Sequence, residues 1–400
     1  MKPRGRLVLI GALAVTAIAV APIPQSSSPF ADEVDLKGMQ LGLSAVSGRT
    51  TRDAFMRDLA IIDPLHQLDP YLVVGERSVA LYRDAKHHAL VAEVSLRTSE
   101  PAEKPSWRMM VVDPGHWGGT WSQLERRHVT VGGGGPVREG DLTLATALRL
   151  RAKLPDVRLT RTQVATEAFP LGVRADYDQA FEQRIIMGES FSPWLGWPTL
   201  ADVLRLWPER NAMADKRAYE TYTHFDLRSR PAGVRPDEIF VSVHYNVSNV
   251  GQANGIMAFI YGDALEGELA TPSQRYWAVR RALDGTLSVS RELATQFAWA
   301  LQKRMGLPPI GENPNAEKPN RITLDGAAGV HARNLAVLRR APGPAVLLEG
   351  PCMNDAAEYP RFLNERVSLD GVMVPVRAEE YADAIADVAR RFFALSGAAP

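Results

Sequence analysis

Three short apolar runs, each followed by a polar side chain, constrain the fold of this chain more than any other feature. The runs span residues 110–112, 239–243 and 345–348, and the side chains that follow them are His116, His244 and Glu349. Apolar runs of this length that end at turn or polar residues are typical of buried strands. Because open α/β sheets bind ligands at the carboxyl ends of their strands, we expect these three side chains to converge in one crevice.

Strands and helices alternate between residues 109 and 393. Further strands are expected at residues 157–160 and 255–260. Helices are expected directly after Glu139, from Ser290 to the terminating Gly306, and near the C-terminus, where Tyr381, Ile385, Val388 and Phe392 form an apolar stripe. This alternation predicts an α/β fold with a twisted, mostly parallel sheet that helices cover on both faces.

The first residues carry the pattern of a secretory signal. One lysine and two arginines precede an apolar stretch at residues 7–21, which is short for a membrane span. We therefore expect an exported protein of the periplasm or cell envelope, with residues 1–31 as signal segment and linker. A proline follows Ala21, so cleavage near Ala31 and retention of the segment as an anchor both stay open.

Composition divides the rest of the chain into two parts. Residues 32–105 form a small N-terminal region with three expected strands, at residues 71–74, 79–82 and 90–94. Residues 106–400 form the main domain, which is interrupted at residues 163–225 by an insertion rich in Phe, Trp and Pro. The aromatic side chains of this insertion either pack it against the sheet or line a sugar-binding wall.

Charge and cysteine content exclude two classes of protein. The chain has 46 Lys and Arg against 46 Asp and Glu, so it lacks the basic footprint of a nucleic-acid-binding protein. Cys352 is the only cysteine, which excludes an internal disulfide and predicts a small buried side chain. The adjacent His87 and His88 are expected at the surface. Composition does not determine the oligomeric state.

Four residues form a candidate hydrolytic metal site. Catalytic zinc is commonly held by three His and carboxylate ligands with one position open to water, and His116, Glu139 and His244 can supply that set. A further carboxylate must then carry the proton to the leaving group, and Glu349 is the candidate. Each signal has a structural alternative: a histidine satisfied within the fold, or a glutamate that pairs with a helix N-terminus.

Four stretches of this chain resemble the zinc-dependent N-acetylmuramoyl-L-alanine amidases of bacterial cell walls. They are Val-Val-Asp-Pro-Gly-His at 111–116, Glu-Gly-Asp-Leu-Thr-Leu-Ala at 139–145, Ile-Phe-Val-Ser-Val-His-Tyr-Asn at 239–246 and Pro-Ala-Val-Leu-Leu-Glu at 344–349, and they occur in the order of that family. The resemblance runs from residue 109 to about residue 393 and is interrupted by the insertion. The chain departs from the family at Trp117, where glycine is usual, and at Pro351 and Cys352, where an aromatic residue is usual.

The resemblance implies a function and a role for each of the four residues. His116, Glu139 and His244 would bind Zn2+, and Glu349 would be the catalytic carboxylate. The substrate would be peptidoglycan, cleaved at the amide between N-acetylmuramic acid and the L-alanine of the stem peptide. Two alternatives stay open: another exported zinc amide hydrolase, such as a peptidase or deacetylase, and a non-catalytic wall-binding module with the same fold.

Residues 262–289 form a polar stretch with two interpretations. In some members of the amidase family, a segment at this place blocks the zinc until an activator protein withdraws it. Asp263, Glu266 and Glu268 could occupy the water position on the metal in this way. The alternative is an ordinary exposed acidic loop, since polar stretches of this length are usually surface.

Overall fold

The computed structural model describes residues 34–99, 106–119, 122, 125, 127–163, 227, 230–247, 254–311, 322–369 and 372–395. The expected signal segment and residues 164–225 of the expected insertion lie outside these ranges, so both interpretations of the aromatic insertion stay predictions. The chain from Val34 onward forms one compact unit. Among the described residues, no helix is both long and apolar enough to cross a membrane.

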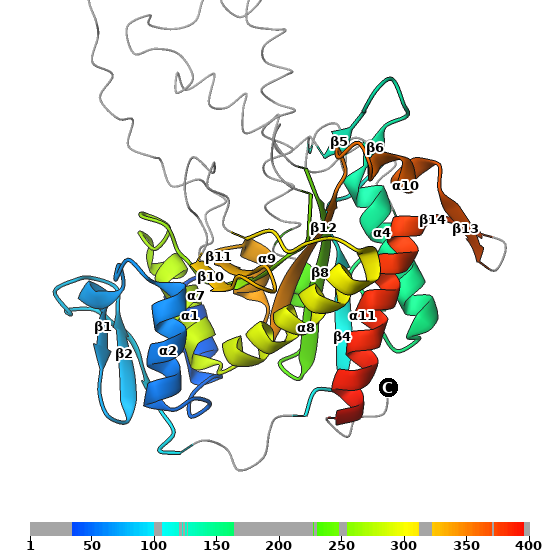
Figure 1. The fold of residues 1–400 in the computed structure, drawn as a ribbon. Helices are drawn as coiled ribbons and strands as arrows, with labels where there is room; N and C mark the ends of the chain where they lie inside the picture. The colour runs from blue at the N-terminus through cyan, green and yellow to red at the C-terminus, as the bar shows by residue number, and fades with distance from the viewer. Residues whose placement is uncertain are drawn as a thin grey trace, which may run out of the picture. The chain divides into compact units, whose positions relative to one another are not determined.

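A seven-stranded sheet organises the described part of the chain (Figure 1). Its strands lie in the order β10-β11-β9-β12-β8-β4-β7. Their bounds are Ile322–Asp325 for β10, Val330–Arg333 for β11, Met257–Tyr261 for β9, Ala345–Cys352 for β12, Glu238–Asn246 for β8, Met109–Pro114 for β4 and Arg158–Leu159 for β7. Only the β10–β11 and β9–β12 pairs are antiparallel, which confirms the mostly parallel sheet.

The three strands that were expected to end in site residues lie next to one another. Strand β8 pairs in parallel with β4 on one side and with β12 on the other. Every residue of β8 from Glu238 to Val243 is buried, as are the first four residues of β12. Continuous burial is typical of a parallel strand covered on both faces, and it explains why these runs are apolar throughout.

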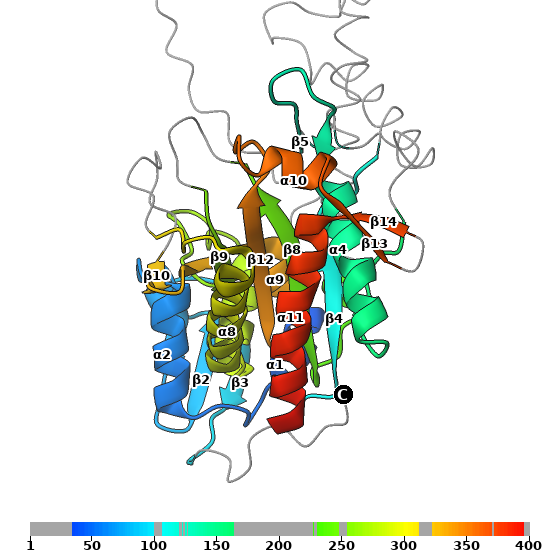
Figure 2. The same ribbon diagram turned by 45° about the vertical axis from the view of Figure 1, so that its right-hand side comes forward.

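Three long helices lie side by side along one face of the sheet: α4 (Glu139–Lys153), α8 (Leu287–Met305) and α11 (Val376–Leu395) (Figure 2). The predicted stripe of α11 faces the core, with Tyr381, Ile385 and Val388 fully buried. The short helix α9 (Ala336–Arg340) contacts β9 and β12 and lies behind the sheet in this view. Helix α8 ends where expected, because Gly306 takes the left-handed C-cap conformation with φ +67°.

The N-terminal region has the three strands that its sequence predicts. Strands β1 (Leu72–Val74), β2 (Ser78–Tyr82) and β3 (Leu90–Ser95) form an antiparallel sheet after the short 3-10 helix η1 (Asp69–Tyr71). Two helices precede them, α1 (Leu36–Ser44) and α2 (Arg52–Ile62), whose first turns are capped by Asp35 and Thr51. His87 and His88 are exposed, as expected.

Residues 262–289 are not the exposed loop that their polarity suggests. Residues Pro272–Leu283 form helix α7, which begins with a capping box between Thr271 and Gln274. Its apolar side chains Tyr276, Val279 and Leu283 recur at helical spacing and are buried, and the helix packs against α1 and α2. Its many arginines obscured this stripe in the sequence. Some charged residues of this stretch are also buried: Arg281 is fully buried and pairs with Asp284 at 2.5 Å.

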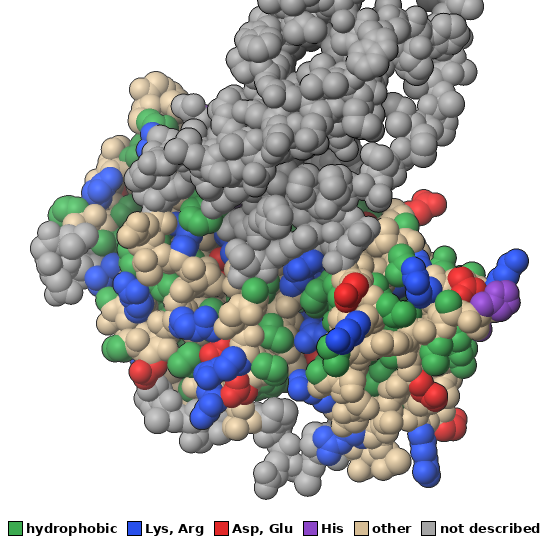
Figure 3. All heavy atoms as spheres, turned by 180° about the vertical axis from the view of Figure 1, so that it is seen from behind, with side chains coloured by type: hydrophobic (Ala, Val, Ile, Leu, Met, Phe, Trp, Pro, Cys, Tyr) green, Lys and Arg blue, Asp and Glu red, His purple; other side chains and the backbone are tan. Residues whose placement is uncertain are grey.

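Several small elements complete the described fold. Two short hairpins, β5 (His128–Val129) with β6 (Val137–Arg138) and β13 (Arg366–Leu369) with β14 (Val372–Pro375), flank helix α10 (Tyr359–Leu363). The single Cys352 is buried, as predicted. On the face that Figure 3 shows, acidic and basic side chains are interspersed, in agreement with the balanced composition.

Candidate active site and metal centre

His116, Glu139 and His244 form a cluster at the carboxyl edge of the sheet. One nitrogen or oxygen of each lies within 4.8 Å of the other two. Glu139 Oε1 is 3.0 Å from His244 Nδ1, and Glu139 Oε2 is 3.4 Å from His116 Nε2. These residues come from the turn after β4, the first turn of α4 and strand β8, so the fold brings together three segments that are far apart in the sequence.

The turn after β4 is shaped to bring the two histidines together. His116 has a left-handed backbone with φ +56°, which is uncommon for a residue other than glycine and is often found at functional sites. At Gly115 a Cβ atom would lie only 2.3–2.6 Å from atoms of the His244 ring. Glycine is therefore required there by close approach, since any side chain would displace the imidazole.

Glu139 is buried and points at the histidines rather than serving only the helix N-terminus. Its carboxylate accepts hydrogen bonds from the backbone N–H of Tyr245 at 3.2 Å and from the His244 ring. The residue after it, Gly140, packs on the backbone of Gly118, where a Cβ atom would be 2.0 Å from the nitrogen. This close packing holds the start of α4 against the turn that carries His116.

Opposite charges within the cluster shift the pKa values of Glu139 and His244. Burial opposes ionisation of Glu139, but the charges of His116 and His244 outweigh it and lower the pKa of this carboxyl to about 2. Burial likewise opposes protonation of His244, but the hydrogen bond and charge of Glu139 raise the pKa of the imidazole above its ordinary value. The carboxylate is thus ionised at neutral pH and buried, an arrangement that a bound cation would stabilise.

Glu349 lies on the strand next to His244. It is half-buried, and burial raises its pKa to about 7, with His244 acting against this shift and the negative charge of Glu139 adding to it. A carboxyl with a pKa near neutrality can both accept and release a proton, which is what a general acid–base group requires. The structure therefore brings all four residues singled out in the sequence to one edge of the sheet.

Sequence analysis missed a buried ionic network directly beneath this cluster. Asp113, at the end of β4, accepts hydrogen bonds from Thr160 and Ser242 at 2.7 Å each and faces the Arg230 guanidinium at 3.4 Å. Burial opposes its ionisation, but Arg230 and the two hydroxyls keep the pKa of Asp113 below its ordinary value. The available signal was the charged Asp113 at the end of an otherwise apolar strand, although an aspartate before Pro-Gly is equally typical of a turn.

Arg161 is a second arginine that the sequence did not single out. Its buried guanidinium donates to the carbonyls of Pro114, Gly115 and Gly140 at 3.0, 3.2 and 2.8 Å. These carbonyls belong to the two backbone segments that carry His116 and Glu139, so Arg161 ties them together. Arg228, which lies near the place of a family arginine, is outside the described residues.

Trp117 follows His116 and lies between two arginines. The guanidinium carbons of Arg161 and Arg230 are 6.0 and 5.9 Å from the centre of its ring, within the range of cation–π contact. The aromatic residue that stands in place of the family's usual glycine is thus part of the packing beneath the site.

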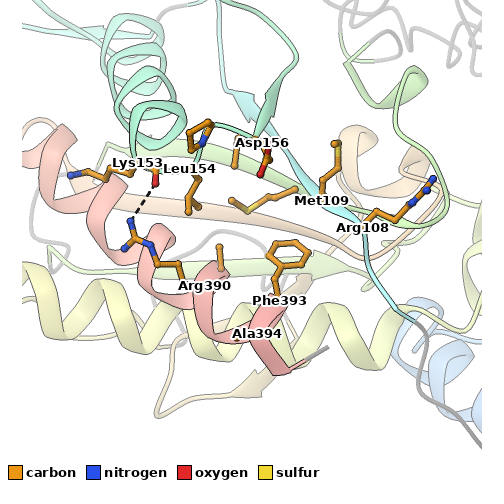
Figure 4. A pocket seen from close by; sticks show the side chains of 12 residues that line it. Arg108, Met109, Lys153, Leu154, Asp156, Arg390, Phe393 and Ala394 are labelled. Atoms are coloured by element: carbon orange, nitrogen blue, oxygen red, sulfur yellow. Dashed lines mark hydrogen bonds between the residues drawn. The ribbon is translucent and has the colours of Figure 1, made fainter. Parts of the chain in front are cut away.

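A cavity of about 490 Å3 lies at the other end of β4 (Figure 4). It is lined mainly by apolar residues between the end of α4 and the end of α11, including Met109, Leu154 and Phe393. Arg108, Lys153 and Arg390 contribute the cations, and no histidine lines it. The candidate chemistry therefore belongs to the carboxyl edge of the sheet and not to this cavity.

Part of the chain matches a known protein family. Residues 209–368 match the family model described as N-acetylmuramoyl-L-alanine amidase. None of the curated proteins compared matches the chain. The matched segment contains His244 and Glu349, whereas His116 and Glu139 precede it.

Solved structures of amidases are similar to this chain at low identity. The N-acetylmuramyl-L-alanine amidase of Mycobacterium smegmatis is 19% identical, with 73% of this chain and 100% of that chain covered and a TM-score of 0.35. The CwlD amidase of Clostridioides difficile, in complex with the GerS lipoprotein, is 14% identical, with coverages of 72% and 99% and a TM-score of 0.36. The catalytic domain of an N-acetylmuramoyl-L-alanine amidase from Bacillus (Paenibacillus) polymyxa is 18% identical, with coverages of 72% and 98% and a TM-score of 0.34. Because the TM-scores are below 0.5, the similarity to this family rests on the sequence match of residues 209–368.

The class of protein follows from fold and site together. An α/β sheet that gathers two histidines and two carboxylates at its carboxyl edge has the parts of a hydrolase. The sequence match then shows that residues 209–368 of this chain are similar to the N-acetylmuramoyl-L-alanine amidases. This match agrees with the resemblance seen in the sequence motifs and includes the two motifs that contain His244 and Glu349.

Proposed function

We propose that this chain hydrolyses the amide bond between N-acetylmuramic acid and the L-alanine of the peptidoglycan stem peptide, with Zn2+ held by His116, Glu139 and His244. The observation that carries the proposal is the convergence of these three donors to within 4.8 Å of one another, beside the strand that carries Glu349. The match to the amidase family supports the choice of bond and of substrate.

The donor set fits a catalytic zinc ion. Two imidazoles and one carboxylate are a common ligand set for zinc that must keep a coordination position open. The low pKa of Glu139 keeps its carboxylate ionised, and the side chain of Arg127, 3.8 Å away, is about half exposed. When bound, Zn2+ supplies electrophilic activation of a water molecule and of the scissile carbonyl.

The chain's own residues carry out the proton transfers. Glu349 accepts a proton from the attacking water and returns it to the alanine amine as that group leaves. A pKa near 7 suits both steps, because the group must be a base at the start and an acid at the end. Arg161 and the Asp113–Arg230 pair hold the backbone of the turn, so that His116 stays in place while substrate binds.

The setting proposed for the enzyme is the cell envelope. The basic residues and apolar stretch at residues 2–21 support export, with the segment either removed or retained as an anchor. Peptidoglycan is the proposed macromolecular partner. Of the three acids that could have blocked the metal, Glu268 accepts hydrogen bonds from Leu265 N–H and Asn334, Asp263 is buried, and Glu266 is exposed. None of them belongs to the cluster of His116, Glu139 and His244. We therefore include no autoinhibitory role for residues 262–289.

The experiment that tests this function is a digest of purified muropeptides combined with a metal assay. An amidase releases the intact stem peptide with a free alanine amine, and the zinc content should be near one per chain. A shortened stem peptide would indicate a peptidase, and released acetate would indicate a deacetylase. Binding to peptidoglycan without any product would contradict hydrolysis.

A further inference from the structure

We propose that Glu125 is a positioning residue for His116, which fixes the ring and the backbone of that histidine so that Nε2 faces the metal position. The proposal rests on the proposed metal centre and adds a residue that neither the sequence motifs nor the family match includes. Glu125 lies in the connection between β4 and α4, and its side chain is only 5% exposed.

The Glu125 carboxylate faces His116 from the side opposite to Glu139. Its Oε1 is 3.4 Å from His116 Nδ1, whereas Glu139 Oε2 is 3.4 Å from His116 Nε2. The two carboxylates therefore contact the two different nitrogens of one imidazole. Glu125 lies outside the three-residue cluster that could hold an ion, so its role is not that of a ligand.

This contact favours one tautomer of the ring when a cation occupies the metal position. A carboxylate accepts hydrogen bonds, so a His116 ring that binds a cation through Nε2 would keep its proton on Nδ1, where Glu125 lies. Without a cation, the Glu139 carboxylate is equally close to Nε2, and removal of Glu125 would leave Glu139 as the carboxylate that contacts the ring. Histidines that bind metal ions generally donate their other N–H to a carboxylate or carbonyl in this way, and loss of that partner lowers metal affinity by about 10- to 100-fold.

The same carboxylate also holds the strained backbone of the turn. Both oxygens of Glu125 accept from the backbone N–H of Trp117, at 3.2 and 3.1 Å. This N–H follows directly on the left-handed His116, so the contact stabilises the conformation that turns the imidazole toward Glu139. One side chain therefore acts on both the ring and the backbone of the same residue.

The segment that carries Glu125 is itself anchored to the site. The carbonyl of Arg127 accepts a hydrogen bond from the Glu139 N–H at 3.0 Å, and the Arg127 N–H donates to the Ser122 carbonyl at 2.9 Å. The ring of His128 also contacts the Ser122 carbonyl at 3.1 Å. Glu125 thus reaches His116 from a segment that is tied to a second residue of the cluster.

The test compares Glu125→Ala and Glu125→Gln with the wild-type chain and with Glu76→Ala, which removes an exposed carboxylate in the β1–β2 turn. Zn2+ affinity is measured by competition with a chromophoric chelator, and folding is checked by circular dichroism and thermal melting. Glu125→Ala should weaken zinc binding by about 10- to 100-fold. Glu125→Gln keeps an oxygen acceptor, so its zinc affinity should stay within a few-fold of wild type. The zinc affinity of Glu76→Ala should equal that of wild type.

A second readout separates positioning from general stability. Ring 15N shifts of His116, recorded at pH 8.5, should show the proton on Nδ1 in the zinc-bound wild-type chain. In the metal-free proteins, Glu125→Ala should carry the proton on Nδ1 in a smaller fraction of molecules than wild type, because Glu139 still contacts Nε2 and nothing replaces Glu125 at Nδ1. Zinc affinity of Glu125→Ala within twofold of wild type, or weaker binding with an unchanged tautomer, would overturn the proposal. A wild-type chain that binds no zinc would instead contradict the proposed function, and the metal-free spectra would still decide the role of Glu125.

Discussion

Glu349 and His244 are direct partners in the register of the adjacent parallel strands β12 and β8. Paired residues on neighbouring strands project from the same face of a sheet, so this register places the carboxyl on the side of the histidine. A slip of one residue would send Glu349 to the opposite face. The proposed division of roles, with three residues to hold a metal and Glu349 to move a proton, therefore depends on strand register.

Replacing Glu349 by glutamine should abolish turnover while zinc stays bound. The amide cannot accept or return a proton, and loss of a general acid–base group costs about a hundred- to ten-thousandfold in rate. Zinc content is measured by atomic absorption and stem-peptide release by chromatography. Activity within a few-fold of wild type would assign the proton transfer to another residue.

The same carboxyl should make the metal-free protein less stable as the pH rises. Its folded pKa of about 7 lies above the ordinary value of 4.5, so the folded state binds the proton more tightly than the unfolded state. The stability that this group contributes is therefore complete below about pH 4.5 and is lost as the pH rises through 7. It amounts to no more than about 3.4 kcal/mol. Melting in EDTA at pH 5 and pH 8 measures this. The loss of stability between pH 5 and pH 8 should be smaller in Glu349→Gln than in wild type. An equal loss in wild type and variant would refute the link between this carboxyl and stability.

Replacing Asp113 by asparagine should destabilise the fold strongly. The buried Arg230 guanidinium would lose its opposite charge, and the new NH2 group could not accept from both Thr160 and Ser242. Breaking a buried ion pair costs about 3–5 kcal/mol. Urea unfolding of Asp113→Asn against Asp156→Asn, which alters an exposed carboxylate, measures the difference. A loss below about 1 kcal/mol would show that the network is not a major source of stability.

Replacing Gly115 by alanine should weaken zinc binding at least about tenfold, because the added methyl group would overlap the His244 ring and displace a ligand. The matched control is Gly135→Ala, since a Cβ at Gly135 meets no atom within 4 Å. Chelator competition on both variants gives the two affinities. Equal zinc affinity in both variants would mean that His244 can move without cost, or that it does not bind the metal.

The local features of this protein were readable in its sequence. Continuous apolar runs of the length of buried strands predicted β4, β8 and β12, and an apolar stripe at helical spacing predicted α11. Both patterns depend only on residues that are close in the sequence. His116, His244 and Glu349 were singled out for the same reason, since each follows the end of an apolar run. Glu139 was singled out from its place at the start of a helix together with the family motif.

Contacts between distant segments were decided only by the tertiary structure. Strand order places β12 between β9 and β8, and this order makes Glu349 a neighbour of His244, although the two residues are 105 positions apart in the sequence. Asp113 with Arg230, and Glu125 with the ring of His116, are recognisable as partners only once the strands and the turn are in place. Helix α7 was missed because its arginines suggested a solvent-exposed segment, whereas in the structure α1 and α2 cover its apolar face. Short-range periodicity determines which segments form strands and helices, whereas burial and charge pairing depend on where the folded chain places residues that are far apart in sequence.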